Sequence, residues 1–366
     1  MHVTVGKSGL CKVLKGPFGS GDDRVAYAPR VRGPLDERGV TRDSMVDRHE
    51  PERAAAWYGA GLSAVVEHSP KVGVVSIERA DGVSHTRHVL QYGEHELSYE
   101  VYGSGDRVLL WLHGLLLDAN LGRGLAQSLA AHGNRVVLLD LLGHGHSDKP
   151  SDPAAHRMDL HVQQVICLLD TLGVDKAVLG GVSLGADVSL LTAVAAPERV
   201  SGLILDMPVL EWGMPTAVTI FLPLLIGLRN AGAAARLVSW AATRLPRSGF
   251  GPLDSLIGAA ACDPDELAAV LHGILLGPIA PTVEQRRSVS APALVMGHRR
   301  GLMHPFSDAE NLASQLPDAR LLRSHNIAEL WLRPGRLTAE LSAFLDSAWA
   351  DAQPPVAPHQ PLSEAV

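Results

Sequence analysis

Cysteine is scarce in this 366-residue chain, which contains only Cys11, Cys167 and Cys262. Three widely spaced cysteines provide neither a disulfide framework nor a CxxC metal motif, so we expect a reducing compartment. The sequence also lacks an HExxH motif and any cluster of cysteine and histidine. No metal ion and no organic cofactor are therefore predicted.

An excess of basic residues and a long apolar run are also lacking. The formal net charge of −7 gives no reason to expect nucleic acid or an acidic membrane surface as a partner. The longest apolar run, residues 217–228, is too short to span a bilayer and is interrupted by Pro223. The first residues lack the pattern of a secretion signal. We expect a soluble, cytoplasmic protein without a membrane span, and the sequence does not indicate its oligomeric state.

The apolar residues, 46% of the chain, are arranged in short runs separated by helical patterns. Residues on either side of Gly93 are typical of an antiparallel pair of strands. The later runs suit strands covered on both faces. This alternation predicts an α/β fold with a mostly parallel sheet, helices on both faces and a site at the carboxyl ends of the strands. These later runs are residues 107–114, 135–141, 176–182, 200–206, 292–297 and 319–324.

The sequence pattern divides the chain into four parts. We predict a poorly ordered extension over 1–53, a helical segment over 54–84, the α/β domain over 85–349 and a disordered tail over 350–366. Within the domain, residues 211–288 contain apolar helical stretches and no obvious strand. This insertion predicts a helical cap that roofs the site and favours a substrate with an apolar portion. The alternative is a set of ordinary core helices without a role in substrate choice.

The stretch LGGVSLGADV, residues 179–188, places Ser183 between Gly181 and Gly185, after an apolar run and before a helical pattern. Such a strand–turn–helix crossing needs flanking glycines because the serine backbone is strained and the neighbouring segments approach closely. The turn lifts the hydroxyl out of the sheet and aims the amino end of the helix at it, which favours a developing oxyanion. Ser183 is therefore the candidate nucleophile.

Two further motifs accompany this serine, and from about residue 86 to 349 the chain resembles the α/β-hydrolase fold family. LLWLHGLLLDA resembles the family's HG oxyanion loop, and DLLGHGHSDKP resembles its DxxGxGxSxxP segment. The resemblance implies a sheet of about eight strands, Ser183 as nucleophile and an oxyanion hole formed by the N–H groups of Leu115 and Leu184. It implies structural roles for four other residues: His113, Asp140, His144 and His146.

The acid of the predicted triad departs from the family pattern. The family places an aspartate in the loop after the strand PALVMG, but Gly301 stands there in this chain. The next carboxylate, Asp308, is expected to begin a helix. Asp206 ends the preceding strand, as the acid does in some relatives, and is the predicted alternative. A helix or turn cap is an equally good interpretation of Asp206.

The base departs from the family pattern as well. The family histidine lies in a glycine-containing loop after the last strand, where RLLRSHNIAELWLRPGRL offers only His325. His304 belongs to an HP pair at a position that is usually not catalytic in the family. We therefore predict a triad of Ser183, His325 and Asp206, in which the histidine takes the hydroxyl proton and the carboxylate orients the ring.

Two functions of different classes fit these residues. The first is a serine hydrolase, esterase-like, that cleaves an ester or related acyl bond of a small, partly apolar substrate. The second is a catalytically degenerate protein of the same fold that binds a small apolar ligand. The retained serine favours the hydrolase, whereas Gly301 and the irregular histidine loop favour the second. Haloperoxidase-like and lyase chemistry use the same residues and stay open.

Overall fold

The apolar runs of the sequence form the central strands of the protein in a computed structural model. The structure describes residues 11–14, 65–68, 72–80 and 83–351, except residues 231, 276, 299–300, 302 and 333. The strands are β1 (Cys11–Leu14), β2 (Val65–His68), β3 (Val72–Ala80), β4 (Val83–Tyr92), β5 (His95–Tyr102), β6 (Val108–Leu112), β7 (Arg135–Leu139), β8 (Ala177–Val182), β9 (Val200–Asp206), β10 (Ala293–His298) and β11 (Ala319–Ser324).

Helices follow most of the strands from β6 onward. The helices are α2 (Arg123–Ala131), α3 (Met158–Thr171), α4 (Leu184–Ala195), α5 (Met214–Asn230), α6 (Gly232–Ala242), α7 (Gly251–Ala260), α8 (Pro264–Leu275), α9 (Val283–Arg287), α10 (Phe306–Gln315), α11 (Glu329–Leu332) and α12 (Gly335–Asp351). Short 3-10 turns are η1 (Ala119–Gly122), η2 (Pro153–His156) and η3 (Pro197–Arg199).

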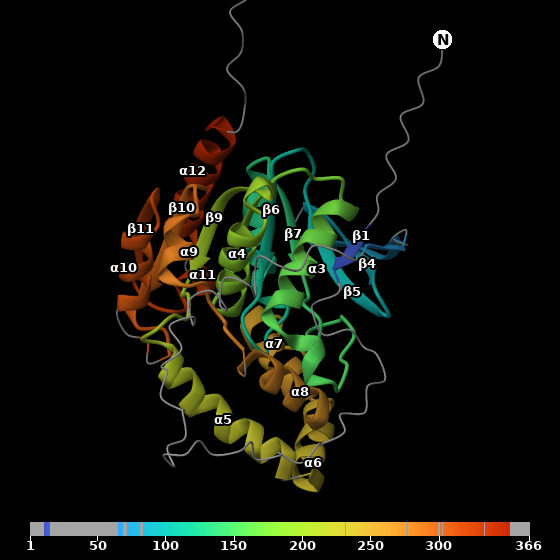
Figure 1. Ribbon diagram of the computed structural model, residues 1–366. Helices are drawn as coiled ribbons and strands as arrows, with labels where there is room; N and C mark the ends of the chain where they lie inside the picture. The colour runs from blue at the N-terminus through green and yellow to red at the C-terminus, as the bar shows by residue number, and fades with distance from the viewer. Residues whose placement is uncertain are drawn as a thin grey trace, which may run out of the picture. The chain divides into compact units, whose positions relative to one another are not determined.

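In the described part of the chain, nine strands form one sheet in the order β11-β10-β9-β8-β6-β7-β5-β4-β3 (Figure 1). Strands β6 to β11 run parallel, whereas β5, β4 and β3 are joined by antiparallel pairing. All residues of β6, β8 and β10 are buried, as expected of strands covered on both faces. The carboxyl ends of these strands therefore meet along one edge of the sheet.

Two layers of helices cover the sheet. Helices α2 and α12 share a buried apolar cluster with side chains of the central strands. Helices α3 and α4 pack against each other, and α4 lies on β6, β8 and β9 (Figure 1). In α3, Val162, Val165 and Leu169 are buried at helical spacing, so the amphipathic pattern of the sequence places this helix on the sheet.

Between β9 and β10 the chain leaves the sheet and forms helices α5 to α9. In Figure 1, α5 and α6 extend away from the sheet, and α7 and α8 lie between them and the strands. Helix α5 contacts α8, and α7 contacts η1 near the carboxyl edge of β6. The inserted helices thus lie beside the edge of the sheet where the strands end.

The mostly parallel sheet, predicted with about eight strands, is confirmed, and it has nine strands among the described residues because β3 extends the antiparallel part. One sequence prediction needs correction. Residues 72–80 lie in the predicted helical segment over 54–84, yet they pair with β4 as a strand. The β-branched residues Val72, Val74 and Ile77 favour this extended conformation.

The predicted disordered ends lie largely outside the described residues. In the extension over 1–53, the structure describes β1, which pairs with β2 in a two-stranded sheet. In the tail, helix α12 extends to Asp351 and residues 352–366 lie outside the described part. Among the described residues, no single helix has the length and apolarity to cross a bilayer; α5 and α6 meet those criteria only as a pair, bent by 104°.

Candidate active site

Ser183 lies in a strained turn between β8 and α4. Its φ and ψ angles are 55° and −113°, a backbone conformation that a serine rarely adopts. Its N–H donates a hydrogen bond of 2.8 Å to the carbonyl oxygen of Asp206, and its own carbonyl accepts the N–H of Asp187 at 3.0 Å. These bonds hold the strand end and the first turn of the helix together, which offsets a strain of about 1–3 kcal/mol.

The glycines beside Ser183 allow close contact between α4 and β6. A Cβ atom on Gly181 would lie 2.5 Å from the carbonyl oxygen of Leu112, and one on Gly185 would lie 2.3 Å from the same oxygen. Both distances are far below a van der Waals contact. Side chains at these two positions would push the helix away from the strand, so the glycines fix the direction of the Ser183 hydroxyl.

A histidine lies within hydrogen-bond distance of that hydroxyl. The Oγ atom of Ser183 is 2.9 Å from Nε2 of His304, in the loop between β10 and α10. His304 is 8% exposed. Burial, and then the neighbouring ring of His298, lower the pKa of His304 to about 4. The ring is therefore neutral at pH 7, and its Nε2 is placed to accept the proton of the serine hydroxyl.

The predicted base, His325, is not brought to Ser183. Its side chain is 74% exposed, and its Nδ1 lies 3.0 Å from Oε1 of Glu329. The carboxylate of Glu329 also binds Arg336, which fixes the start of the loop at the surface. Ile327 of the same loop and Trp331 of α11 line the cavity at Ser183 instead.

The predicted acid, Asp206, is buried at the end of β9, between the register positions of Val182 and Met296. Burial raises the pKa of its carboxyl group to about 7. Among the described residues, no carboxylate forms a hydrogen bond with the ring of His304. The structure therefore joins Ser183 and His304 as a pair and does not join Asp206 to either imidazole.

The position where the family carries its aspartate has no room for a side chain. A Cβ atom on Gly301 would lie 2.7 Å from Cε1 of His298 and 2.6 Å from the carbonyl oxygen of His304. His298 is itself buried, with Nε2 at 3.1 Å from the sulfur of Met207. The imidazole of His298 thus occupies the space beside His304 into which an acid at position 301 would project.

Two other buried carboxylates near the site accept hydrogen bonds from backbone N–H groups. Asp308 accepts N–H groups of Leu210, Trp212 and Gly213 at 2.8–3.0 Å, and so anchors the segment that enters α5. Asp187 accepts the N–H of Val209 at 3.1 Å and also lines the cavity at Ser183. Burial raises the pKa of Asp187 well above its usual range.

The predicted oxyanion groups lie at the same edge of the sheet as Ser183. Leu115 and Leu184 both line its cavity, and neither N–H has a hydrogen-bond acceptor within the described ranges. The neighbouring Leu116 has a positive φ of 61°, and Gly114 accepts the N–H of Leu117 at 3.0 Å in a tight turn. Backbone strain therefore clusters around the serine, as it does in many active sites.

Three of the four predicted structural residues, His113, Asp140 and His144, are buried and bond to backbone groups, whereas the side chain of His146 is 53% exposed. His113 bonds through Nδ1 to the carbonyl of Gly114 at 2.9 Å, and its Nε2 accepts the N–H of Leu141 at 3.1 Å. Asp140 accepts N–H groups of Ala119 and His146 at 2.7 and 2.9 Å. His144 bonds through Nδ1 to the carbonyl of Leu142 at 3.2 Å. These contacts fix the loops that border Ser183.

The cavity at Ser183 has a volume of about 200 Å³ and is mostly apolar. Its walls come from the strand ends, from α5 and α8 of the insertion, and from the loop after β11. The apolar residues that form these walls include Leu117, Val209, Met214, Ala217, Phe221, Ile274, Ile279 and Trp331. The hydroxyl of Ser183 therefore faces a space suited to an apolar group of modest size.

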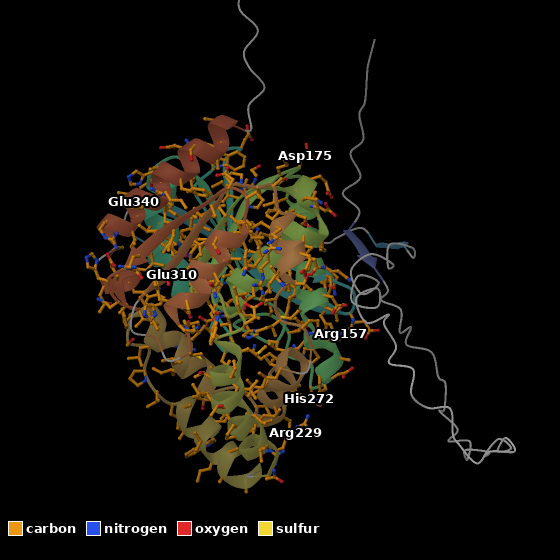
Figure 2. All side chains as sticks on the ribbon, turned by 60° about the vertical axis from the view of Figure 1, so that its left-hand side comes forward. Arg157, Asp175, Arg229, His272, Glu310 and Glu340 are labelled. Carbon is orange, nitrogen blue, oxygen red and sulfur yellow. The ribbon has the colours of Figure 1, made fainter. Side chains whose placement is uncertain are left out.

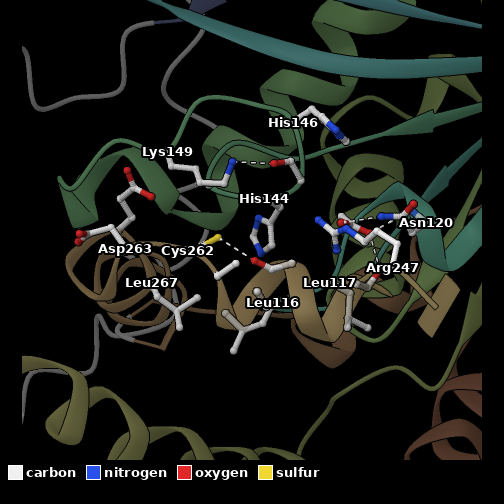
Figure 3. A pocket seen from close by; sticks show the side chains of 18 residues that line it. Leu116, Leu117, Asn120, His144, His146, Lys149, Arg247, Cys262, Asp263 and Leu267 are labelled. Atoms are coloured by element: carbon white, nitrogen blue, oxygen red, sulfur yellow. Dashed lines mark hydrogen bonds between the residues drawn. The ribbon is translucent and has the colours of Figure 1, made fainter. Parts of the chain in front are cut away.

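A second cavity, of about 440 Å³, lies between α7, the start of α8 and the loop that holds His144 (Figure 3). It is more polar, but its cations are already engaged. Lys149 donates to the carbonyls of Gly145 and Ser147, and Arg247 donates to the carbonyl of Asp254. In the described parts of the chain, no group of three or more side chains of His, Cys, Asp or Glu is arranged to hold a metal ion.

The sheet order and the strained serine match a known fold. Residues 107–260 match the family described as alpha/beta hydrolase fold. This chain has the α/β-hydrolase fold. Its solved neighbours include an enol-lactonase from Burkholderia xenovorans, with a TM-score of 0.56, 21% identity, and coverage of 69% of this chain and 98% of that one. An esterase from Thermogutta terrifontis has a TM-score of 0.57 and 20% identity, and covers 76% of this chain and 99% of that one.

Curated relatives match this α/β-hydrolase-fold chain over shorter stretches. A 2-hydroxymuconate semialdehyde hydrolase from a Pseudomonas species is 34% identical over 105 residues, 29% of this chain and 34% of the relative. A 2-hydroxy-6-oxononadienedioate/2-hydroxy-6-oxononatrienedioate hydrolase from Paraburkholderia phymatum is 34% identical over 136 residues, 34% of this chain and 47% of the relative. The matched stretches therefore span less than half of these relatives.

Sequence reasoning passed over His304, although the fold gives a reason to consider it. The loop after β10 begins at the same edge of the sheet as the loop after β11, so either loop is able to reach Ser183. Family position favoured the second loop and its His325. The burial of His304 and its distance to the serine are set by tertiary packing, and no short-range signal in the sequence carries them.

Proposed function

We propose that this protein is a serine hydrolase that uses a dyad of Ser183 and His304 on small acyl substrates with an apolar portion. The observation that carries the proposal is the 2.9 Å distance between the serine Oγ and the imidazole Nε2. A serine needs such a base because its hydroxyl is a weak nucleophile near pH 7. The hydrolase names of the relatives support the same reaction class.

The proposed reaction passes through an acyl-enzyme. Oγ of Ser183 attacks the acyl carbon while its proton moves to Nε2 of His304. The N–H groups of Leu115 and Leu184 bind the oxyanion, and the imidazolium then protonates the leaving group as the acyl–oxygen bond breaks. Water, deprotonated by the same ring, releases the acid and restores the serine. The apolar cavity would hold the acyl or leaving-group chain.

The direct test is covalent labelling with a fluorophosphonate, which reacts with an activated serine without knowledge of the substrate. The wild-type protein should be labelled on Ser183, and Ser183→Ala should not be labelled. Ser189→Ala is a matched control. Ser189 is a buried serine one turn further along α4, and its hydroxyl donates to the carbonyl of Gly185. If the folded wild-type protein is not labelled, the hydrolase proposal is wrong.

The pH dependence of labelling follows from the buried base. Burial lowers the pKa of His304 to about 4, so the neutral, proton-accepting ring dominates at every higher pH. We expect the labelling rate constant to be flat from pH 9 to about pH 5.5 and to fall as the pH passes through about 4. The rate is measured across this range with circular dichroism as a check on folding. A limb near pH 6.5 would contradict this assignment.

The second candidate, a non-catalytic binding protein, is favoured by one observation. The ring of His304 has no carboxylate partner in the described part of the chain, so an imidazolium formed there is not stabilised by an opposite charge. In that case the cavity binds an apolar ligand without turnover. A fluorescent fatty acid that binds with micromolar affinity to unlabelled protein would support this function.

A further inference from the structure

The inserted helices expose an unusual amount of apolar surface. Soluble monomers rarely expose large contiguous apolar patches, and such patches mark sites of interaction with proteins or membranes. We call the exposed residues of α5, α6, the following turn and α7 the cap surface. Each of its large apolar side chains is at least 39% exposed: Ile220, Leu222, Leu224, Ile226, Leu237, Val238, Trp240, Leu245, Phe250, Leu253 and Leu256.

Helix α5 is apolar on two opposite sides. One side, with Ala217 and Phe221, lines the cavity at Ser183, and Leu225 packs against α8. The other side exposes Ile220 and Ile226 among its large side chains. An amphipathic helix on a protein surface normally turns its outer side to water with polar residues. The sequence of α5 therefore suits a second apolar environment outside the protein.

The cap surface is also basic, unlike the chain as a whole. Residues 212–262 contain four arginines, and their one acidic residue, Asp254, is buried. Arg244 stacks on the ring of Trp240 at 3.5 Å, and Arg229 pairs with His272 rather than with an acid. In Figure 2, Arg229 and His272 lie among the inserted helices at the bottom of the view, far from the labelled Glu340.

The other two arginines have partners within the protein. Arg236 forms an exposed ion pair of 3.0 Å with Asp265, at the start of α8, and Arg247 binds a backbone carbonyl. Further acids near that end, Asp263 and Glu266, border the second cavity. Within the described residues of α5 and α6, by contrast, every charged side chain is an arginine. The basic residues of the cap surface therefore lie on α5, α6 and the turn that follows them.

We propose that the cap surface binds the surface of an anionic phospholipid bilayer. Exposed apolar side chains next to arginine and tryptophan are the composition of helices that lie in the plane of a membrane interface. Arginines on such a surface are attracted by acidic headgroups. The net charge of −7 did not indicate this site because it sums over the whole chain, whose acidic residues lie outside α5 and α6.

Charge argues against two other occupants of the cap surface. The N-terminal residues 1–64 contain ten basic and eight acidic residues, so this segment does not complement a basic surface. A second copy of the chain in a symmetric dimer would place the same basic surface on both sides of the interface. Like charges in such an interface are unfavourable. An acidic lipid surface is the occupant that matches both the apolar and the basic residues.

The position of the cap surface has a consequence for the substrate, which rests on the proposed hydrolase function. Because α5 separates the cap surface from the cavity at Ser183, an apolar substrate would pass from the bilayer along Met214 and Phe221 to the serine. This route favours acyl substrates that partition into membranes. Binding to vesicles itself does not require an active serine.

The test is co-sedimentation of the full chain with vesicles. We expect binding to vesicles of phosphatidylcholine mixed with phosphatidylglycerol, and much weaker binding to phosphatidylcholine alone or at high salt. Arg229→Gln and Arg244→Gln should each weaken binding about fivefold. Leu237→Ser and Val238→Ser, both at residues 63% exposed, should each weaken it at least about fivefold without loss of folding.

Matched controls lie outside the cap surface. Leu332→Ser replaces a leucine that is 64% exposed on α11, and Arg320→Gln replaces an exposed arginine on β11. Both variants, and Ser183→Ala, should bind vesicles as the wild type does. Equal binding to both vesicle types, no binding, equal losses in the controls, or a dimer that Leu237→Ser dissociates would each overturn the proposal. A fluorophosphonate-negative protein that still binds acidic vesicles would overturn only the hydrolase function.

Discussion

His304→Ala is expected to slow fluorophosphonate labelling of Ser183 by about 10²–10⁴-fold, the usual contribution of a positioned general base. The imidazole Nε2 of His304 lies 2.9 Å from the serine Oγ, and its removal leaves the hydroxyl without a proton acceptor. The measurement is the pseudo-first-order rate constant of labelling for wild type and variant at pH 8, with equal folding shown by circular dichroism.

His325→Ala is the matched control for this result. His325 is 74% exposed and bound to Glu329, so its loss should leave the labelling rate close to that of the wild type. Adding imidazole to His304→Ala should restore part of the rate, because the small base can enter the space that the side chain leaves. The opposite pattern, a large loss for His325→Ala and none for His304→Ala, would return the base to the loop after β11.

Asp206→Asn is expected to stabilise the protein increasingly as the pH rises. Burial raises the pKa of Asp206 from 3.8 to about 7 in the folded state. Because burial favours the protonated carboxyl group, Asp206 contributes fully to stability below about pH 4. This contribution is lost as the pH rises through the folded-state pKa of about 7. This loss amounts to about 4 kcal/mol in the unfolding free energy, and the neutral asparagine avoids it.

Urea unfolding at pH 4.5 and pH 8 measures this effect. The difference in unfolding free energy between Asp206→Asn and wild type should move in favour of the variant by several kcal/mol between the two pH values. Asp308→Asn is the control, because the Asp308 carboxylate accepts three backbone N–H groups and its replacement should destabilise the protein at both. A constant difference for Asp206→Asn would show that Asp206 is ionised and paired in the folded protein, as a triad acid would be.

Local sequence patterns were sufficient to predict much of the fold and one member of the candidate pair, Ser183. Continuous apolar runs such as β6 and β8 predicted buried parallel strands, because a strand covered on both faces has apolar residues on both faces. The two glycines around Ser183 predicted its strained turn, since only a residue without a side chain permits the approach of α4 to β6. The strand β3 was missed because its pairing with β4 supplies the stability that residues 72–80 lack alone.

The sequence by itself determined the α/β-hydrolase fold and the position of the candidate nucleophile, Ser183, because both depend on residues close together in the chain. Tertiary structure alone decided the partner of Ser183, since His304 is 121 residues away and reaches the serine through the order of the parallel strands. Tertiary structure also decided which charged residues share one surface. A net charge sums over all residues, whereas the charge of one surface depends on the few residues that folding exposes there, such as the arginines of α5 and α6.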